Sequence, residues 1–291
     1  MSSNDINLNN PLPSFEGLSF YVDAFSERKR IQSVMPIFYE EQPLTWMLYK
    51  EEIREFMRGR ANMRILDVGC GSGFWGLLLK KKYPQSEVVC IDKNPVAVER
   101  ARYNALLNKL DITLIEALYK KDLFDELSFD MIVLTPPYHL YDPKDTEKIP
   151  LFARGGEYGL KEFYLQTEIA FHHLKEGGMI LYNQMSAGTD VPDYISFFHN
   201  MVCVGKLKYT NILPPISTST FLEGLYGNLE SSYLKFFAEK MPNLFYTSGV
   251  YNKNRDNFSF SDNTKEKESI LSDASLSWQT RIELHKEINS F

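Results

Sequence analysis

The sequence contains few cysteines, and these show no pattern. The three in 291 residues, Cys70, Cys90 and Cys203, lie far apart without paired spacing. Such a set offers neither a disulfide framework nor the ligand spacing of a metal site, and it is typical of reduced thiols in a cytosol. The amino terminus also lacks the basic start and apolar core of a signal peptide. We therefore expect a cytoplasmic protein without a bound metal.

Long apolar runs are also missing. None reaches the roughly 18 to 20 residues needed to cross a bilayer, which argues against an integral membrane protein and a membrane partner. Glycine, at 16 residues, is far below the one-third or so that a collagen-like chain contains. With 44% hydrophobic and 24% charged residues, the chain is also too apolar to be disordered. Once these classes are excluded, we expect a globular protein.

The sequence has no excess of basic residues. It contains 32 Lys and Arg against 38 Asp and Glu, a formal net charge of -6. Proteins that hold nucleic acid by neutralising phosphates usually show a basic excess. The longest basic clusters, residues 28–30 and 80–82, are short and are typical of solvated helix faces. The composition therefore makes nucleic acid a less favoured partner, although a local groove can be basic on an acidic protein.

What the sequence does contain is an alternation of strands and helices. Buried strands are predicted from unbroken apolar runs at residues 64–68, 87–91, 111–115, 129–134 and 179–182. Helices are predicted between them and before them, at residues 43–57, 74–82, 95–108 and 159–174. Apolar strands separated by helices are typical of a parallel sheet covered on both faces. We therefore expect a Rossmann-like, doubly wound α/β fold.

The pattern changes after residue 185. A helix over residues 192–200 and a strand over 201–209 are followed by a Pro-, Ser- and Thr-rich loop at residues 214–220. A second late strand is predicted at residues 233–239, and an amphipathic helix at 276–288. We expect three parts: a cap or lid segment at residues 1–57, a core at 58–240, and a carboxyl-terminal extension at 241–291.

The most informative segment is a glycine-rich loop between the first strand and the helix at residues 74–82. Its glycines allow the backbone to turn tightly and to approach a ligand near the amino terminus of a helix. Gly71, Gly73 and Gly76 fit the dinucleotide pattern G-x-G-x-x-G, so a nicotinamide cofactor must be considered. Asp67 argues against it, because a carboxylate here would face a negatively charged pyrophosphate. A ligand with ammonium and sulfonium cations would instead be favoured.

A second carboxylate follows about twenty residues later. Asp92 ends the second predicted strand, where an acid can accept hydrogen bonds from both hydroxyls of a ribose. Both nicotinamide and S-adenosylmethionine (SAM) contain such a ribose, so Asp92 supports a nucleoside without choosing between them.

With these residues, the chain resembles the class I SAM-dependent methyltransferases over about residues 62–185. The run Asp67-x-Gly69-x-Gly71-x-Gly73 is a specific form of their first motif. The resemblance implies seven strands in the order 3-2-1-4-5-7-6, with the two late strands as the last hairpin, and SAM as the cofactor. It also implies that SAM is held by the first loop and by the ends of the next two strands, through Asp67, Gly69, Cys70, Gly71, Gly73, Phe74, Asp92, Lys93, Ala117 and Leu118.

The fourth strand ends in Thr135-Pro136-Pro137-Tyr138. Two prolines stop a strand, so a purely structural interpretation is available. The turn also resembles the Asn/Asp/Ser-Pro-Pro-Tyr motif of amino methyltransferases, which act on planar nitrogens. The resemblance implies that the Thr135 hydroxyl and the Pro136 carbonyl accept the N–H bonds of the target group, and that Tyr138 packs on its plane. Thr135 departs from the usual Asn, and its hydroxyl reaches less far.

A further stretch, Gly155-Gly156-Glu157-Tyr158-Gly159-Leu160, resembles a region of the release-factor glutamine methyltransferases. The amino-terminal helical domain of that family is not recognisable, and the carboxyl-terminal hundred residues exceed its usual end. We therefore do not transfer the release-factor substrate.

The favoured hypothesis is an N-methyltransferase whose partner is an acceptor protein or a small polar molecule. A nucleic-acid base amino methyltransferase, with tail aromatics such as Phe236 and Phe245 stacking on a base, is the first alternative. A SAM-binding scaffold without turnover and a nicotinamide oxidoreductase are the others. The sequence assigns neither the acceptor, including whether its target atom is nitrogen or oxygen, nor an oligomeric state.

Overall fold

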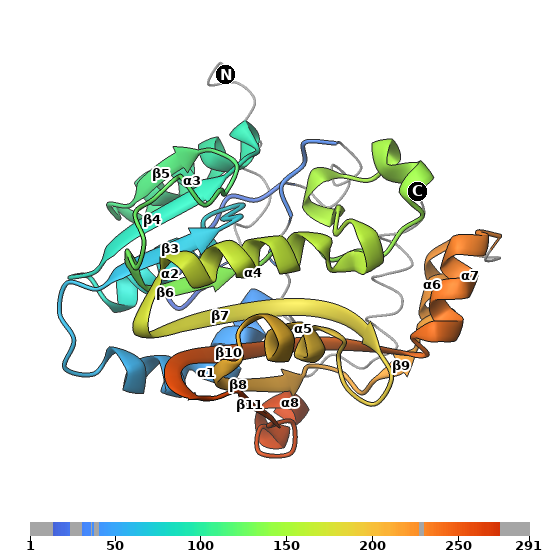
Figure 1. Ribbon diagram of the computed structural model, residues 1–291. Helices are drawn as coiled ribbons and strands as arrows, with labels where there is room; N and C mark the ends of the chain where they lie inside the picture. The colour runs from blue at the N-terminus through green and yellow to red at the C-terminus, as the bar shows by residue number, and fades with distance from the viewer. Residues whose placement is uncertain (1–13, 24–30, 36, 38–40, 227–229, 274–291) are drawn as a thin grey trace.

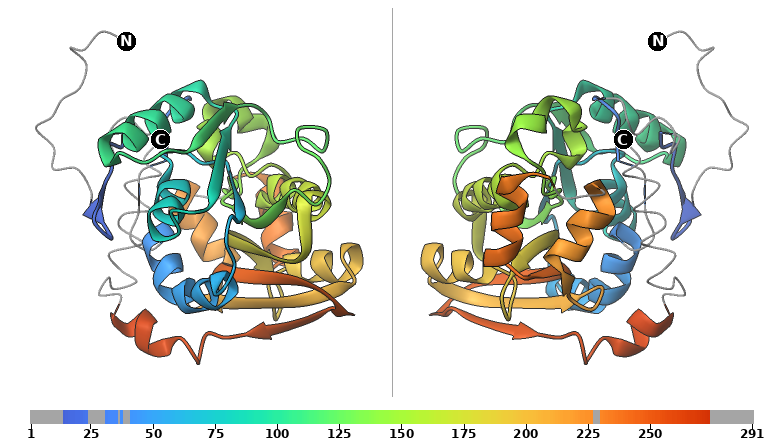
Figure 2. Two further views of the ribbon diagram at one scale, coloured as in Figure 1. Left: turned by 90° about the vertical axis from the view of Figure 1, so that its left-hand side faces the viewer. Right: turned by 90° about the vertical axis from the view of Figure 1, so that its right-hand side faces the viewer.

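A mixed β-sheet forms the centre of the molecule (Figure 1). The computed structural model describes residues 14–23, 31–35, 37, 41–226 and 230–273. Within them the sheet has nine strands, in the order β11-β8-β10-β7-β6-β3-β4-β5, with β9 paired to β10. Figure 2 shows that the sheet is strongly twisted, so that its carboxyl-terminal strands cross the direction of the early ones.

Five strands make the parallel half of the sheet. They are β3 (Arg64–Val68), β4 (Glu87–Asp92), β5 (Thr113–Glu116), β6 (Phe129–Leu134) and β7 (Leu174–Gly188). They lie in the order β5-β4-β3-β6-β7, and each neighbouring pair is parallel. Parallel neighbours need crossover connections, which here contain α2 (Phe74–Lys82), α3 (Pro95–Asn108) and α4 (Lys161–His173). This half agrees closely with the sequence prediction.

The antiparallel half completes the expected order. Strand β10 (Asn243–Asn257) lies between β7 and β8 (Val204–Asn211) and is antiparallel to both. Counted along the chain without the short β9, the seven main strands lie in the order 3-2-1-4-5-7-6, which confirms the prediction. Two short strands are added: β9 (Ile216–Ser217) on β10 and β11 (Ser259–Asp262), parallel to β8.

One late element was predicted wrongly. Residues 233–239, expected as a strand, belong to helix α7 (Ser232–Lys240). The Ser231 hydroxyl caps this helix by accepting a hydrogen bond from the Leu234 N–H at 3.2 Å, and Leu234 and Phe237 are buried at helical spacing. The last strand of the hairpin is therefore β10. The sheet continues through this strand to Asp262, beyond the core boundary expected at residue 240.

Helices cover both faces of the sheet. On one face α1 (Gln42–Met57), α2 and α3 pack on alternate strand residues such as Ile65 and Val133. On the other, α4 and α5 (Tyr194–Met201) pack on the intervening residues, such as Leu66 and Leu134. This two-faced burial explains why the strands read as unbroken apolar runs.

The remaining elements are short or lie at the edges of the sheet. Helices α6 (Thr218–Tyr226) and α7 lie side by side at the end of the sheet that carries β9 (Figure 1). The others are β1 (Ser14–Phe15), β2 (Leu18–Ser19), α8 (Glu268–Asp273), and the 3-10 helices η2 (Pro143–Lys148), η3 (Leu151–Ala153) and η4 (Glu157–Gly159). No helix among the described residues is long and apolar enough to span a membrane. The helix predicted at residues 276–288 lies outside the described residues.

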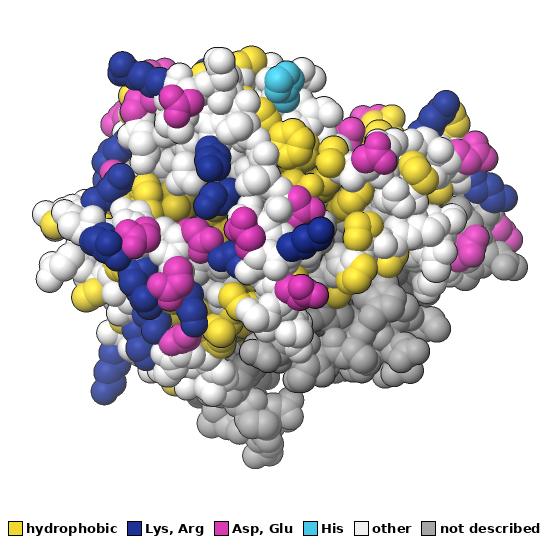
Figure 3. All heavy atoms as spheres, turned by 90° about the horizontal axis from the view of Figure 1, so that it is seen from below, with side chains coloured by type: hydrophobic (Ala, Val, Ile, Leu, Met, Phe, Trp, Pro, Cys, Tyr) yellow, Lys and Arg dark blue, Asp and Glu magenta, His cyan; other side chains and the backbone are white. Residues whose placement is uncertain are grey.

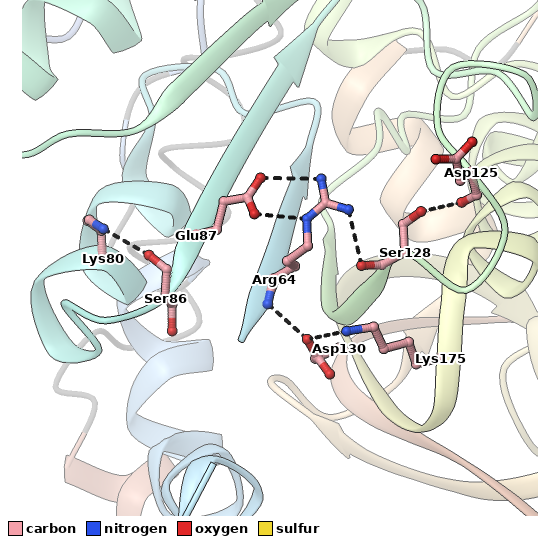
Figure 4. A network of polar contacts seen from close by, with 8 residues as sticks. All are labelled: Arg64, Lys80, Ser86, Glu87, Asp125, Ser128, Asp130 and Lys175. Carbon is pink, nitrogen blue, oxygen red and sulfur yellow. Dashed lines mark hydrogen bonds and ion pairs between the residues drawn. The ribbon is translucent and has the colours of Figure 1, made fainter. Parts of the chain in front are cut away.

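Polar contacts tie together the amino ends of the parallel strands (Figure 4). The Arg64 N–H donates to the Asp130 carboxylate at 2.8 Å, and Lys175 pairs with the same carboxylate at 2.9 Å. The Arg64 guanidinium also reaches Glu87 on β4, with Nε 3.0 Å from Oε2. These contacts link β3, β4, β6 and the start of β7 at one edge, which leaves the carboxyl ends of the strands for the site.

Candidate active site

A pocket opens at the carboxyl ends of the parallel strands. Its lining comes from the loops that follow β3, β4, β5 and β6, which is where open parallel sheets bind their ligands. Of the residues predicted from the sequence, those that line it are Gly69, Cys70, Gly71, Phe74, Asp92, Lys93, Ala117, Leu118, Thr135, Pro136, Pro137 and Tyr138. Segments far apart in the sequence are thus brought to one cavity.

The glycine loop turns through backbone angles that favour glycine. Gly69, Gly71 and Gly73 have φ values of 69°, 53° and 83°. The N–H groups of Gly69 and Cys70 both donate to the Ile91 carbonyl, at 2.9 and 3.0 Å, which ties the loop to β4. A Cβ on Gly69 would lie 3.7 Å from the Thr135 carbonyl oxygen, so this loop and the proline turn are close neighbours.

Gly73 lies behind the pocket rather than in its lining. It forms the amino-terminal cap of α2, and a Cβ there would lie 3.2 Å from the Cβ of Ala101 on α3. Its role in the structure is therefore to let α2 and α3 approach each other.

Asp92 is already engaged with the loop beside it. Its carboxylate accepts hydrogen bonds from the Gly71 N–H at 3.0 Å and from the Asn94 N–H at 2.8 Å. Burial raises the pKa of Asp92 above its ordinary value, although both backbone donors oppose this shift. The carboxylate thus stands next to the glycine loop in a fixed orientation, with further acceptor positions for ligand hydroxyls.

Asp67 differs from the sequence expectation, because its carboxylate does not line the pocket. The side chain is 1% exposed and accepts a hydrogen bond from the Gly76 N–H, at 2.9 Å, beneath the loop. Its other oxygen, Oδ1, has no hydrogen-bond partner among the described residues. Burial raises the pKa of Asp67 from 3.8 to about 7, and the nearby charge of Asp92 adds to this effect.

Two cysteines meet behind the loop although they are twenty residues apart. The Cys90 thiol, as a neighbour of the Cys70 thiol, together with burial raises the pKa of Cys70 well above its ordinary value. A thiol held in the neutral form is a weak nucleophile, so Cys70 acts as a packing residue of the lining.

The proline turn is held from two distant elements. The Tyr138 hydroxyl donates a hydrogen bond to the Glu41 carboxylate at the start of α1. The Tyr246 hydroxyl, from β10, lies 3.4 Å from the Tyr138 hydroxyl. Burial, and after it the charge of Glu41, raises the pKa of Tyr246 well above its ordinary value, so the Tyr246 hydroxyl is neutral.

Several polar residues of the lining were not among the predicted site residues, and Glu41 was marked only as the end of the possible lid segment 38–41. Glu41 and Gln42 come from the start of α1, and Asn183 comes from β7. Asn183 donates to the Thr45 hydroxyl at 3.0 Å, which ties β7 to α1. Neither a motif nor a spacing marks these residues, because they join the site only when α1 packs against the sheet.

The segment before α1 also reaches the pocket. Ser33, Val34 and Met35 are part of its lining. The Val34 N–H donates to the Asp23 carboxylate at 2.8 Å, and Asp23 in turn pairs with Arg100 on α3. Residues 38–40, which the sequence marked as part of a lid over SAM, lie outside the described residues.

Residues 155–160, which resemble a region of the release-factor glutamine methyltransferases, pack against the backbone of the Thr135–Tyr138 turn. A Cβ on Gly155 would lie 2.8 Å from the Tyr138 carbonyl carbon, and one on Gly159 would lie 2.7 Å from the Tyr138 carbonyl oxygen. Only glycine allows so close an approach. The glycines therefore fix the backbone of Tyr138 rather than line the cavity.

The residues of the pocket fit SAM better than a dinucleotide. Asp92 ends β4, where an acid can accept hydrogen bonds from the hydroxyls of a ribose. Lys93 is the only Lys or Arg among the described lining residues, so the lining lacks the cations that a pyrophosphate attracts. Trp75 Nε1 and the Oε1 atoms of Gln42 and Gln166 are buried in lining residues without a protein partner in the described chain, which provides polar groups for a ligand.

Comparison with known proteins agrees with this geometry. Residues 53–155 match the methyltransferase small domain family. The release factor glutamine methyltransferase of Flavobacterium psychrophilum is 33% identical over 180 residues, which is 58% of each chain. The ribosomal RNA small subunit methyltransferase C of Haemophilus influenzae is 33% identical over 78 residues, or 26% of this chain and 22% of that one.

Similarity to solved structures is lower. The tRNA m1G37 methyltransferase of Methanocaldococcus jannaschii covers 85% of this chain and 58% of its own, at 15% identity and a TM-score of 0.46. The chain spans about half the length of the curated relatives that it matches. In its matched domain, in these relatives and in its strand order, the chain is similar to the class I SAM-dependent methyltransferases.

Proposed function

We propose that this protein transfers the methyl group of SAM to a planar nitrogen of a protein side chain or a small polar molecule. The observation that carries the proposal is that the Thr135–Tyr138 turn and the glycine loop with Asp92 line one pocket. A cofactor held by the loop and an acceptor held by the turn would meet there.

The cofactor half of the pocket supports a role in binding SAM. In our proposal the Asp92 carboxylate accepts the ribose hydroxyls, while Ala117 and Leu118 lie along the adenine. The Ala117 N–H donates to the Asp92 carbonyl at 3.0 Å, which fixes this loop next to the acid. Bound SAM would supply an electrophilic methyl group on a sulfonium centre.

The acceptor half would act mainly by orientation. The Thr135 hydroxyl and the Pro136 carbonyl can each accept an N–H of the target group, which directs the nitrogen lone pair toward the methyl group. Proline has no N–H, so the backbone of Pro136 and Pro137 offers hydrogen-bond acceptors and no donors. Tyr138, held by Glu41 and Tyr246, would limit the tilt of a planar group. Fixed dipoles of this kind need no reorganisation during transfer.

A base-modifying enzyme is the second candidate, because one relative is named as a ribosomal RNA methyltransferase. The charges argue for the first candidate. The described lining carries Glu41, Asp92 and Glu162 but one cation, Lys93. On the face shown in Figure 3, positive and negative side chains are interspersed and form no continuous basic stripe. Phosphate binding usually requires such a stripe.

Transfer of labelled methyl from SAM into fractionated cell extract is the most informative test. We expect label in a protein or small-molecule fraction, with little dependence on salt concentration. Label in a nucleic-acid fraction, with affinity that falls steeply with salt, would favour the base-modifying enzyme. SAM binding without transfer to any fraction would indicate a scaffold.

Two substitutions separate the halves of the pocket. We expect Asp92→Ala to weaken SAM binding by about 10- to 100-fold in calorimetry, because charge-assisted hydrogen bonds are lost.

Thr135→Ala should lower turnover by about tenfold or more and leave the SAM dissociation constant nearly unchanged. Unchanged SAM affinity in the first variant, or unchanged turnover in the second, would remove the assignment of that residue.

We further propose that the protein acts in the cytoplasm. The support is chemical: Cys70, Cys90 and Cys203 are all free thiols.

A further inference from the structure

A buried histidine stands behind the cofactor half of the pocket. His173 is the last residue of α4 and is 0% exposed. Its Nε2 lies 3.0 Å from the Lys121 carbonyl oxygen and 3.2 Å from the Phe124 carbonyl oxygen. Its Nδ1 lies 3.0 Å from the Tyr119 hydroxyl. A single imidazole therefore contacts three points of the loop between β5 and β6.

The partners of His173 decide which ring nitrogen carries the proton. Carbonyl oxygens only accept hydrogen bonds, so Nε2 carries a proton and donates it to the loop backbone. Burial lowers the pKa of His173 below its ordinary value, which favours the neutral ring. Nδ1 is then an acceptor, and the Tyr119 hydroxyl donates to it. Both nitrogen atoms of the imidazole thus hold the loop.

Few other contacts define the shape of this loop. Residues 117–128 contain no helix or strand in the described structure. The first residue is tied to β4, and near the end of the loop the Leu127 N–H donates to the His172 carbonyl at 3.1 Å. Among the described residues, the hydrogen bonds that link residues 118–126 to another element are the three of His173.

The same loop lines the cofactor half of the pocket. Ala117, Leu118 and Tyr119 are part of the lining. The first two side chains have no polar atom, and the hydroxyl of the third is bonded to His173. Polar recognition of a base along this loop must therefore come from backbone N–H and C=O groups, whose positions depend on the conformation of the loop.

We propose that His173 is a positioning residue that makes the cofactor site selective for adenine, because it holds the backbone of residues 117–124 in place against the edge of the base. The inference rests on the proposed binding of SAM and specifies how its base is recognised. Adenine presents an amino donor beside an acceptor nitrogen, whereas hypoxanthine presents a carbonyl acceptor beside an N–H donor. A backbone fixed to match the first pattern opposes the second, and a loose backbone distinguishes them poorly.

The test is a pair of ligands that differ only at this edge of the base. The full-length protein is titrated by calorimetry with S-adenosylhomocysteine and with S-inosylhomocysteine. We expect the wild type to bind the adenine ligand at least about tenfold more tightly, because the inosine ligand leaves backbone groups unpaired. His173→Phe keeps a ring beside Phe124 but removes all three hydrogen bonds. It should reduce the preference to about threefold or less.

Matched variants separate positioning from packing. His172→Phe is the same substitution one residue earlier, where the imidazole meets Glu126 at the surface, and it should leave the preference unchanged. His173→Gln can still donate an N–H to a loop carbonyl and should recover part of the preference. If His173→Phe does not fold, Tyr119→Phe removes one of the three contacts and should lower the preference by about twofold or more.

Two outcomes would overturn the inference. One is the absence of a preference for the adenine ligand in the wild-type protein. The other is an unchanged preference in the folded variant, with both ligands weakened by the same factor, because a merely structural role of His173 would give that result. In either case, binding of S-adenosylhomocysteine would leave the proposed function standing. Failure of the protein to bind S-adenosylhomocysteine would instead contradict the proposed function itself.

Discussion

Three carboxylates lie around the pocket, two of them buried and Asp92 partly buried, and their neighbours differ. Asp92 accepts two backbone N–H groups and stands at the cofactor half. Glu41 accepts a tyrosine hydroxyl and lies at the acceptor half. Asp67 accepts a single N–H, from Gly76, and lies beneath the loop without facing the cavity. The same chemical group thus has a different set of hydrogen-bond donors at each of these three places.

Asp67 should make the stability of the protein depend on pH. Its pKa is about 7 in the folded chain against 3.8 ordinarily, so between these values the folded chain binds more protons than the unfolded chain. The free energy of unfolding therefore falls as pH rises from about 4 to about 7, by at most about 4 kcal/mol.

Asp67→Asn tests this expectation, because an amide oxygen can still accept the Gly76 N–H but cannot ionise. Denaturant unfolding of both proteins from pH 4 to pH 8 should show the variant gaining stability relative to the wild type as pH rises. A difference that stays constant over this range would contradict the buried, raised pKa of Asp67.

At the scale of elements, helix α3 connects the amino-terminal segment to the glycine loop. Asn104 of α3 accepts the Tyr21 N–H at 2.6 Å and donates to the Tyr21 carbonyl at 3.0 Å. Its amide also donates to the Ser72 carbonyl, in the glycine loop, at 2.8 Å. One turn later, Asn108 repeats the pairing with Ser19 but does not touch the loop. The segment and the loop are therefore fixed by one side chain.

We expect Asn104→Ala to weaken SAM binding by about tenfold, because the Ser72 carbonyl and both polar groups of Tyr21 lose their partner. Calorimetry with SAM measures the effect. Asn108→Ala is the matched control: it removes the same kind of pairing from the same helix and should change SAM affinity less than twofold. Equal losses in both variants would show that general loosening of the segment, not its link to the loop, is responsible.

At the scale of the molecule, the sheet unites the chain from Arg64 to Asp262. Strand β10 pairs with β7 over residues 243–252 and with β8 on its other side. It also carries Tyr246 to the proline turn. The carboxyl-terminal region is therefore part of the fold that forms the site, not an addition to a finished core.

A chain that ends at residue 240 should fail to fold. Without β10, strands β7 and β8 lose their shared partner, and the buried side chains of Val250 and Tyr251, one on each face of the sheet, are removed. We expect no cooperative thermal unfolding of this chain by circular dichroism, in contrast to the full-length protein. A cooperative transition together with SAM binding would instead support a core that ends at residue 240.

The sequence alone determined the parts that depend on local signals. Apolar runs and glycine turns predicted β3, β4, β6 and their helices, because both depend on neighbouring residues. Since parallel strands end at one edge, the same signals predicted that Asp92 and Thr135 would share a pocket. Local signals gave the wrong element where tertiary contacts decide the structure. Residues 233–239 are rich in aromatics, which favours a strand, but capping by Ser231 and burial of one helical face make them part of α7.

Only the tertiary structure decided which distant residues complete the site. Glu41 reaches Tyr138 because α1 packs on the face of the sheet that β7 and β10 extend. Asp67 turns toward Gly76 because the first turn of α2 lies directly over the end of β3. Such contacts depend on how helices pack on a sheet, and no spacing along the chain encodes them. The sequence thus determined the kind of core and the position of its pocket, and packing decided the chemistry of the acceptor half.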